Sequence, residues 1–155
     1  MENKKTSSSS PIGFFDSGLG GLTILSEVYQ MLPNEQLIYL ADSKNAPYGK
    51  KSKEEIIALS IKNTEKLIDL GCKMIVVACN TATTNAIKYL RENYSIPFIG
   101  IEPAIKPAAL NSKSDKVGVL ATKGTLSSEL FMLTAKKFEN TQFIEVEGAG
   151  LVEIV

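Results

Sequence analysis

The residues best suited to chemistry in this sequence are the thiol of Cys79 and the two polar residues that follow it, Asn80 and Thr81. They stand directly after the apolar run 74–78, which is typical of a strand covered on both faces. A helix is expected to begin just beyond them, and a helix N-terminus stabilises negative charge and lowers a thiol pKa from about 8.5 toward neutrality. A lone cysteine is often only a buried structural residue, but the Asn-Thr pair offers donors that can hold a carboxylate. The pattern therefore favours a functional thiolate at Cys79.

The other cysteine, Cys72, precedes the same strand, at the end of the sheet away from Cys79. We expect it to be structural or merely exposed. Two cysteines do not make a disulfide framework, and in a reducing compartment both should be free thiols. The sequence contains no histidine, which excludes Ser–His–Asp hydrolases, Cys–His proteases and histidine-ligated metal sites. Acid–base chemistry is left to Cys, Asp, Glu, Lys or Tyr.

Other polar residues also follow predicted strands. Ligands of open parallel sheets bind beyond the carboxyl ends of the strands, and the candidates at that edge besides Cys79 are Asp16, Ser17, Tyr48, Gly49, Thr122 and Thr125. Each has a simpler interpretation as well, because Asp16 could be a helix N-cap and the others could be turn or cap residues. The Gly-rich segment 16–21 matches neither a dinucleotide fingerprint nor a phosphate loop, so a nucleotide site is weakly supported.

An alternation of strands and helices must position these residues. Strands are predicted at 12–15, 37–41, 74–78, 97–101, 117–120 and 143–146, and helices at 82–93, 104–110 and 126–138, after Gly21, and after the capping box formed by Ser52 and Glu55. Residues 122–125 are predicted to form a turn. Such alternation is typical of right-handed βαβ units. The predicted fold is α/β, with mostly parallel open sheets and helices on both faces.

Composition limits the kinds of binding partner and the cellular compartment that we expect for this protein. Apolar residues make up 44% of the 155, and 17 basic residues balance 17 acidic ones, so neither nucleic acid nor an anionic membrane is expected as a partner. No apolar run approaches the roughly 20 residues of a membrane-spanning helix. Residues 1–10 are predicted to be a disordered polar tail and not a signal peptide, which favours a cytoplasmic protein. Residues 150–155 look like a helix just starting, so we expect the chain to be truncated.

Three motifs taken together resemble a known family. They are the segment 14–23 (FFDSGLGGLT), Pro47-Tyr48-Gly49, and the segment 78–83 (ACNTAT), in this order and spacing. They look like those of glutamate racemase, a member of the aspartate/glutamate racemases, and the match runs from about Ile12 to the end of the chain. The resemblance implies two similar flavodoxin-like domains with glutamate between them. It implies a first domain at 11–100 that lacks its closing segment, and the start of a second at 101–155.

The resemblance also implies roles for residues. One cysteine on each side of the substrate α-carbon removes or returns a proton, without pyridoxal phosphate, metal or other cofactor. Cys79 matches the first catalytic cysteine and Asp16 an acidic residue that assists it. Positions that bind glutamate are matched by Ser17, Tyr48, Gly49, Asn80 and Thr81, and further carboxylate contacts by Thr122 and Thr125. Glu153 falls where the family often has an acidic residue near the second cysteine.

The sequence departs from the family pattern because the second cysteine, normally followed by Thr-His, is missing. The resemblance places that motif in a C-terminal stretch not present here. We therefore expect the chain alone to be inactive. The resemblance implies that the parent enzyme supplies D-glutamate for peptidoglycan. A homodimer of the full-length protein is left open.

Other functions stay open on the sequence alone. A related racemase acting on aspartate or a similar acid is one. A non-catalytic flavodoxin-like module that binds carboxylates is another. A nucleotide-binding or phosphoacceptor module is a distant alternative, since no adequate phosphate loop or acidic cluster is present.

Overall fold

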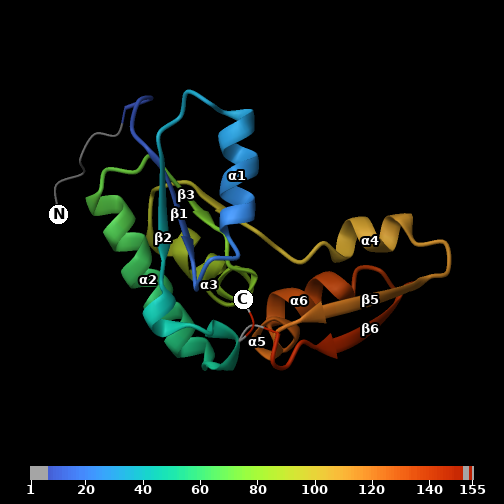
Figure 1. Ribbon diagram of the computed structural model, residues 1–155. Helices are drawn as coiled ribbons and strands as arrows, with labels where there is room; N and C mark the ends of the chain where they lie inside the picture. Colours follow the sequence, from blue (N-terminus) through green and yellow to red (C-terminus); the bar gives the residue numbers. More distant parts are fainter. Residues whose placement is uncertain (1–6, 152–153, 155) are drawn as a thin grey trace.

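The computed structural model describes residues 7–151 and residue 154. Two parallel sheets organise these residues (Figure 1), a four-stranded sheet in the order β2-β1-β3-β4 and a two-stranded sheet of β5 and β6. Every strand pair in them is parallel. The predicted α/β fold with parallel sheets is therefore confirmed.

The four-stranded sheet comprises β1 (Ile12–Asp16), β2 (Leu37–Ala41), β3 (Met74–Val77) and β4 (Phe98–Gly100). Its two faces pack against different helices. Phe14 and Val76 join a cluster with Leu25 and Val28 of α1 (Leu22–Met31), whereas the other face carries the larger core under α2 (Lys53–Asp69) and α3 (Asn80–Asn93). Burial of both faces explains the continuous apolar runs of β1 and β3.

The connection from β2 to α2 contains two short 3-10 turns, η1 (Ser43–Asn45) and η2 (Tyr48–Lys50). The predicted capping box then begins α2, since Ser52 Oγ accepts from the Glu55 amide at 3.2 Å and Glu55 Oε2 accepts from the Ser52 amide at 2.9 Å. Gly71, at φ +83°, follows the end of α2 in a conformation that favours glycine.

The two-stranded sheet pairs β5 (Lys116–Ala121) with β6 (Gln142–Glu147) and packs on α4 (Ile105–Asn111), α5 (Lys123–Leu126) and α6 (Glu129–Ala135). Two local predictions are wrong here. The turn predicted at 122–125 includes most of helix α5, and the single helix predicted at 126–138 is interrupted. The reason is Ser128, whose hydroxyl accepts from the Phe131 amide at 3.3 Å and so caps a new helix.

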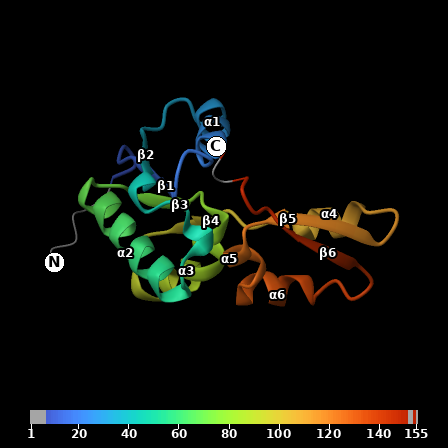
Figure 2. The same cartoon turned by 60° about the horizontal axis from the view of Figure 1, so that its bottom comes forward.

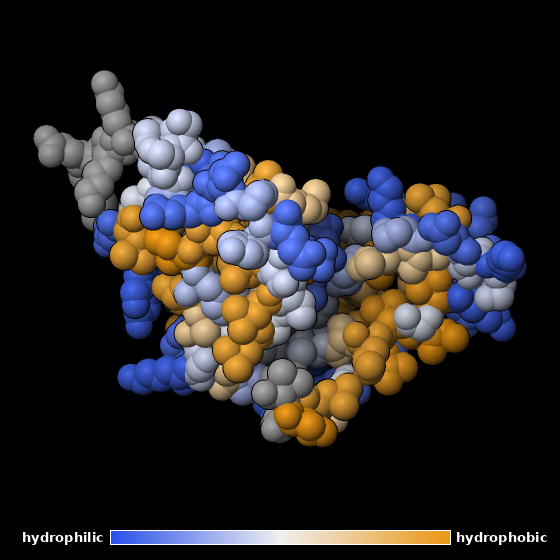
Figure 3. All heavy atoms as spheres, turned by 45° about the horizontal axis from the view of Figure 1, so that its top comes forward, coloured by the Kyte–Doolittle hydropathy of each residue, from blue (hydrophilic) through white to orange (hydrophobic). Residues whose placement is uncertain are grey.

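The two sheets meet through their helices. Seen from the side in Figure 2, α5 lies against α3, while β5 and β6 extend away from the first sheet. Apolar side chains also reach the molecular surface (Figure 3), and those on the second sheet include Leu120, Ile144 and Val146.

Some predictions lie outside the described residues. They are the first six residues of the predicted tail 1–10, and half of the helix start at 150–155, including Glu153. The division into domains at 11–100 and 101–155 stays a prediction. Within the described part of the chain, no helix combines the length and the apolar character that crossing a bilayer requires.

Candidate functional site

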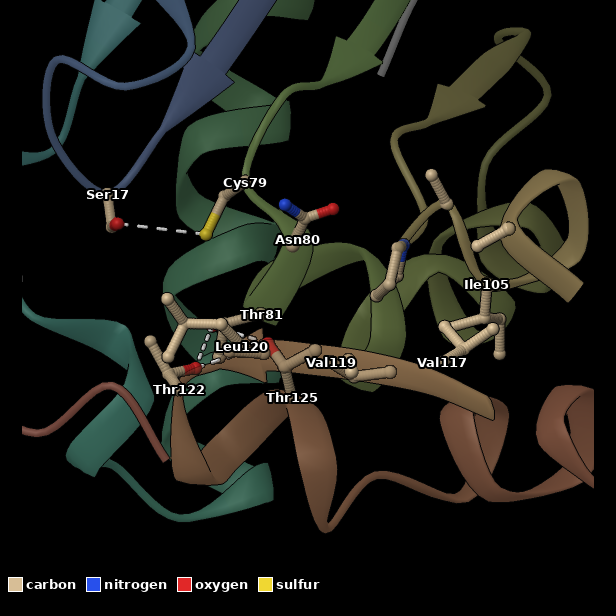
Figure 4. A pocket seen from close by; sticks show the side chains of 15 residues that line it. Ser17, Cys79, Asn80, Thr81, Ile105, Val117, Val119, Leu120, Thr122 and Thr125 are labelled. Carbon is tan, nitrogen blue, oxygen red and sulfur yellow. Dashed lines mark hydrogen bonds between the residues drawn. The ribbon is translucent and has the colours of Figure 1, made fainter. Parts of the chain in front are cut away.

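A pocket of about 540 Å³ opens where the carboxyl ends of β1 and β3 face α4, β5 and α5 (Figure 4). Its polar side is formed by residues predicted from the sequence, namely Ser17, Cys79, Asn80, Thr81, Thr122 and Thr125. Its apolar side includes Ile105, Val117 and Val119. The structure thus brings together side chains that are up to 108 positions apart in the sequence (17 to 125). A mixed lining of this kind is typical of small-molecule sites.

The Cys79 thiol occupies the point where β3 turns into α3. Cys79 is itself the N-cap residue of α3, and its sulfur accepts from the Ala82 amide at 3.4 Å. The thiol in turn donates to Ser17 Oγ at 3.6 Å. Because the sulfur takes the place of a capping oxygen, α3 begins at Asn80, two residues earlier than predicted. Cys79 is 6% exposed, so only a small part of it is open to the pocket.

The electrostatic environment of Cys79 differs from the expectation. Burial raises the pKa of the Cys79 thiol above its ordinary value, and the nearby Asp16 carboxylate raises this pKa further. The hydrogen bonds from Ala82 and with Ser17 act in the opposite direction but do not outweigh these two effects. The prediction that the helix N-terminus brings the thiol pKa toward neutrality is therefore wrong.

Asp16 is a buried carboxylate at the end of β1. Its Oδ2 accepts from the amide of Gly18 at 3.1 Å and from that of Gly21 at 3.2 Å. Since Gly21 is the N-cap residue of α1, the carboxylate holds the Gly-rich turn at the start of that helix. Asp16 is not the helix N-cap of the simpler interpretation, because Gly21 occupies that position. The effect of Asp16 on the thiol pKa shows that the carboxylate is close enough to influence Cys79.

Three threonine hydroxyls form a closed triangle on the opposite side of the pocket. Thr81 Oγ1 lies 2.9 Å from Thr122 Oγ1 and 3.1 Å from Thr125 Oγ1, and the last two are 3.2 Å apart. Thr81 belongs to α3, whereas Thr122 and Thr125 belong to the start of α5. The hydroxyls therefore link α3, which covers the first sheet, to α5, which covers the second. Each hydroxyl can also turn its proton to a different acceptor.

Tyr48 and Gly49 do not line the pocket. The Tyr48 side chain is 1% exposed, and its hydroxyl donates to Asp42 Oδ2 at 2.6 Å and accepts from Asn63 Nδ2 at 3.0 Å. Burial and the bond to Asp42 raise the Tyr48 pKa, so the phenol stays protonated. Gly49 packs against Thr122, which lines the pocket, and a Cβ placed on Gly49 would lie 2.6 Å from Thr122 Cβ.

Three residues near the site escaped the sequence analysis. Asp42 and Asn63 hold Tyr48, and the Tyr39 hydroxyl donates to the Gly18 carbonyl at 2.9 Å. Burial and the Asp16 carboxylate raise the Tyr39 pKa. Asp42 could have been found, because it directly follows β2 at the same edge as Asp16. Asn63 lies inside α2 and Tyr39 inside β2, and neither directly follows a strand, so the sequence does not mark them as site residues.

Cys72 lies in the core at the other end of β3, as expected for a structural residue. Burial raises its pKa as well. Within the described residues, no cluster of three or more Cys, Asp or Glu side chains could hold a metal ion.

Comparison with known proteins agrees with this geometry. The sequence is 50% identical over 146 residues to a glutamate racemase from Herpetosiphon aurantiacus, covering 94% of this chain and 58% of that protein. Among solved structures, the glutamate racemase isoform RacE1 of Bacillus anthracis superposes with a TM-score of 0.85 at 35% identity, over 96% of this chain and 57% of that one. The Escherichia coli glutamate racemase in complex with L-glutamate and the activator UDP-MurNAc-Ala superposes with a TM-score of 0.86 at 35% identity, over 94% and 56% of the two chains.

The chain spans about half the length of these relatives. A model of the Asp/Glu/Hydantoin racemase family matches residues 22–152, which is most of the chain and includes Cys79 and the threonine triangle. The chain therefore belongs to the Asp/Glu/Hydantoin racemase family.

Proposed function

We propose that this chain carries one half of the active site of a glutamate racemase that needs no cofactor. The observation that supports this most is the position of Cys79. Its thiol stands at the carboxyl edge of a parallel sheet, beside Asp16 and Ser17, and faces a pocket whose far side presents hydroxyl groups. The similarity to proteins named glutamate racemase supports glutamate as the substrate within the family.

The reaction requires a base on one side of the α-carbon and an acid on the other. The Cys79 thiolate takes the α-proton from one enantiomer, the electron pair stays on the substrate as a carbanion, and a second acid delivers a proton to the opposite face. For the reverse direction, the Cys79 thiol is the donor. A single base would return the proton to the side from which it came, so Cys79 alone cannot invert the centre.

The second acid–base group does not come from Cys72, because that thiol is buried at the other end of β3. A histidine of this chain cannot be the second group either, because the sequence contains none. We place the second group in a part of the protein beyond these 155 residues, and expect the 155-residue chain alone to leave glutamate uninverted.

Glutamate itself brings a positive charge that favours the Cys79 thiolate. Its ammonium group, placed near Asp16 and Cys79, offsets the carboxylate charge and favours the thiolate, which burial otherwise disfavours. The substrate carboxylates are held by Ser17, Asn80 and the threonine triangle of residues 81, 122 and 125, since hydroxyl and amide groups can donate to them. Tyr48 and Gly49 lie outside the pocket, so we place them as supports of the site, since the Tyr48 hydroxyl is already bonded on both sides and Gly49 packs on Thr122.

In the cell, we place the protein in the cytoplasm, where it supplies D-glutamate for peptidoglycan. The alternative of an aspartate racemase is tested by the same assay. The protein expressed from its complete reading frame is mixed with L-glutamate or L-aspartate in D2O. Loss of the α-hydrogen is followed by proton NMR and formation of the D-enantiomer by chiral chromatography.

We expect deuterated D-glutamate to form much faster than D-aspartate. Faster formation of D-aspartate would show that aspartate, and not glutamate, is the substrate. Binding of glutamate without any exchange would favour the non-catalytic carboxylate-binding module.

A further inference from the structure

The cluster formed by Asp42, Tyr48 and Asn63, called here the Tyr48 network, lies outside the pocket and has no role in the proposed chemistry. It joins three separate elements, namely the end of β2, the turn η2 and the middle of α2. The Tyr48 hydroxyl uses its only proton on Asp42 Oδ2 at 2.6 Å, and one of its lone pairs receives the Asn63 amide at 3.0 Å. A hydrogen bond to a carboxylate at this length is among the stronger kinds.

The network is placed to fix the position of the residue that follows Tyr48. Gly49 packs so closely on Thr122 that an added Cβ would come within 2.6 Å of Thr122 Cβ and 2.9 Å of its Oγ1. On the neighbouring turn, a Cβ on Gly124 would come within 3.1 Å of the Gly49 carbonyl oxygen. The two segments therefore meet with no room for a further side chain beside Thr122, and a small shift of either must move the other.

Thr122 connects this contact to the site. Its hydroxyl belongs to the triangle with Thr81 and Thr125 that faces Cys79 across the pocket. The order of contacts runs from the Tyr48 network to Gly49, from Gly49 to Thr122, and from Thr122 to the hydroxyls that line the pocket. Each step is a packed contact or a hydrogen bond within a buried or half-buried region.

We propose that Asp42 and Asn63 are positioning residues for the substrate-carboxylate site, acting through Tyr48 and Gly49 on Thr122. This inference rests on the proposed function for its substrate, glutamate. None of the three side chains of the network lines the pocket. They set how far the hydroxyl triangle stands from the first sheet, and so how well the two halves of the pocket match one ligand.

Steady-state kinetics on the protein expressed from its complete reading frame test the inference. Tyr48→Phe removes the hydroxyl and leaves the ring. We expect KM for glutamate to rise about tenfold, equivalent to about 1.4 kcal/mol, with kcat little changed, because the contact supports substrate and transition state alike. Asp42→Ala should behave in the same way. Asp42→Asn keeps an oxygen for the phenol and should restore KM to near the wild-type value.

Tyr94→Phe is the matched control. Tyr94 also donates its hydroxyl to a carboxylate, Glu65 Oε1 at 3.2 Å, but at an exposed position away from the pocket. KM should be unaffected by this change. A Tyr48→Phe protein that melts at a lower temperature but keeps the wild-type KM would overturn the inference, since the network would then serve folding only. Should Tyr48→Phe fail to fold, the comparison of Asp42→Ala with Asp42→Asn decides in its place.

A second measurement separates this inference from the proposed function. The melting temperatures of Tyr48→Phe, Thr122→Gly and the double variant need no substrate. If the network acts on Thr122 through Gly49, the two shifts will not add, because both variants loosen the same contact. Additive shifts would overturn the inference even in an active glutamate racemase, whereas coupling without glutamate turnover would contradict only the proposed function.

Discussion

The close contact between Gly49 and Thr122 makes the substitution Gly49→Ala a demanding test of how the two sheets fit together. The new Cβ would lie 2.6 Å from Thr122 Cβ and 2.9 Å from both Cγ2 and Oγ1 of the same residue. Carbon atoms in contact normally stand about 3.5–4.0 Å apart, so one side must move by about 1 Å. Neither partner is the flexible end of a long side chain, and the displacement must be taken up by η2 or α5.

The expected cost follows from this geometry. Overpacking a well-filled interior typically costs about 1–3 kcal/mol. For a protein of this size, each kcal/mol lowers Tm by about 2–4 °C, so a fall of roughly 2–12 °C is expected. The assay is thermal unfolding followed by circular dichroism, with Gly118→Ala as the matched control, because a Cβ on Gly118 meets no atom within 4 Å.

The source of the cost can be checked by a double variant. Thr122→Gly removes all three of the atoms that the new Cβ would approach, so Gly49→Ala should cost little in that background. A Gly49→Ala protein as stable as the wild type would refute the reasoning. So would a cost that persists unchanged when Thr122 is replaced by glycine, because the strain would then arise elsewhere.

Three further predictions concern single side chains. Asp16→Asn removes a charge that raises the Cys79 pKa, so iodoacetamide should alkylate Cys79 faster than in the wild type at a fixed pH near 8. The rise of this rate with pH should also begin at lower pH. An unchanged rate–pH profile would contradict the electrostatic account. Ser52→Ala removes the capping box of α2 and should cost about 1 kcal/mol in the free energy of unfolding measured with urea. Thr64→Val replaces a buried hydroxyl without a hydrogen-bond partner among the described residues and should leave stability unchanged or raise it by about 1 kcal/mol, so a clear loss in the same urea assay would reveal a hidden partner.

Most of the fold could be read from the sequence because its strands are short apolar runs bounded by turn residues. All six predicted strands form, and six of the residues chosen for following them line one pocket at the edge of the sheets. That convergence needs only the rule that parallel strands place their carboxyl ends together. The periodicity of the helices and the capping box at Ser52 were equally local signals.

The errors arise where a tertiary contact or an unusual cap decides the local structure. A thiol caps α3 at Cys79, and the Ser128 hydroxyl starts a new helix inside a continuous apolar pattern. The raised thiol pKa could not be predicted either, since it depends on burial by both sheets and on the distance to Asp16. Tyr48 was predicted to bind the substrate but lies outside the pocket. Its partner Asn63 is 15 positions away in the sequence, so their hydrogen bond becomes visible only in the folded chain.

The central claim is that the Cys79 thiol exchanges the α-proton of glutamate, and one isotope experiment tests it most directly. The protein expressed from its complete reading frame is incubated with glutamate in D2O. For the wild type, Cys79→Ser and Cys72→Ala, loss of the α-hydrogen is measured by proton NMR and formation of the opposite enantiomer by chiral chromatography. We predict that Cys79→Ser slows formation of the opposite enantiomer by at least about a thousandfold, and that Cys72→Ala keeps the wild-type rate because that thiol lies in the core at the other end of β3. Racemisation by Cys79→Ser at the wild-type rate would contradict the account.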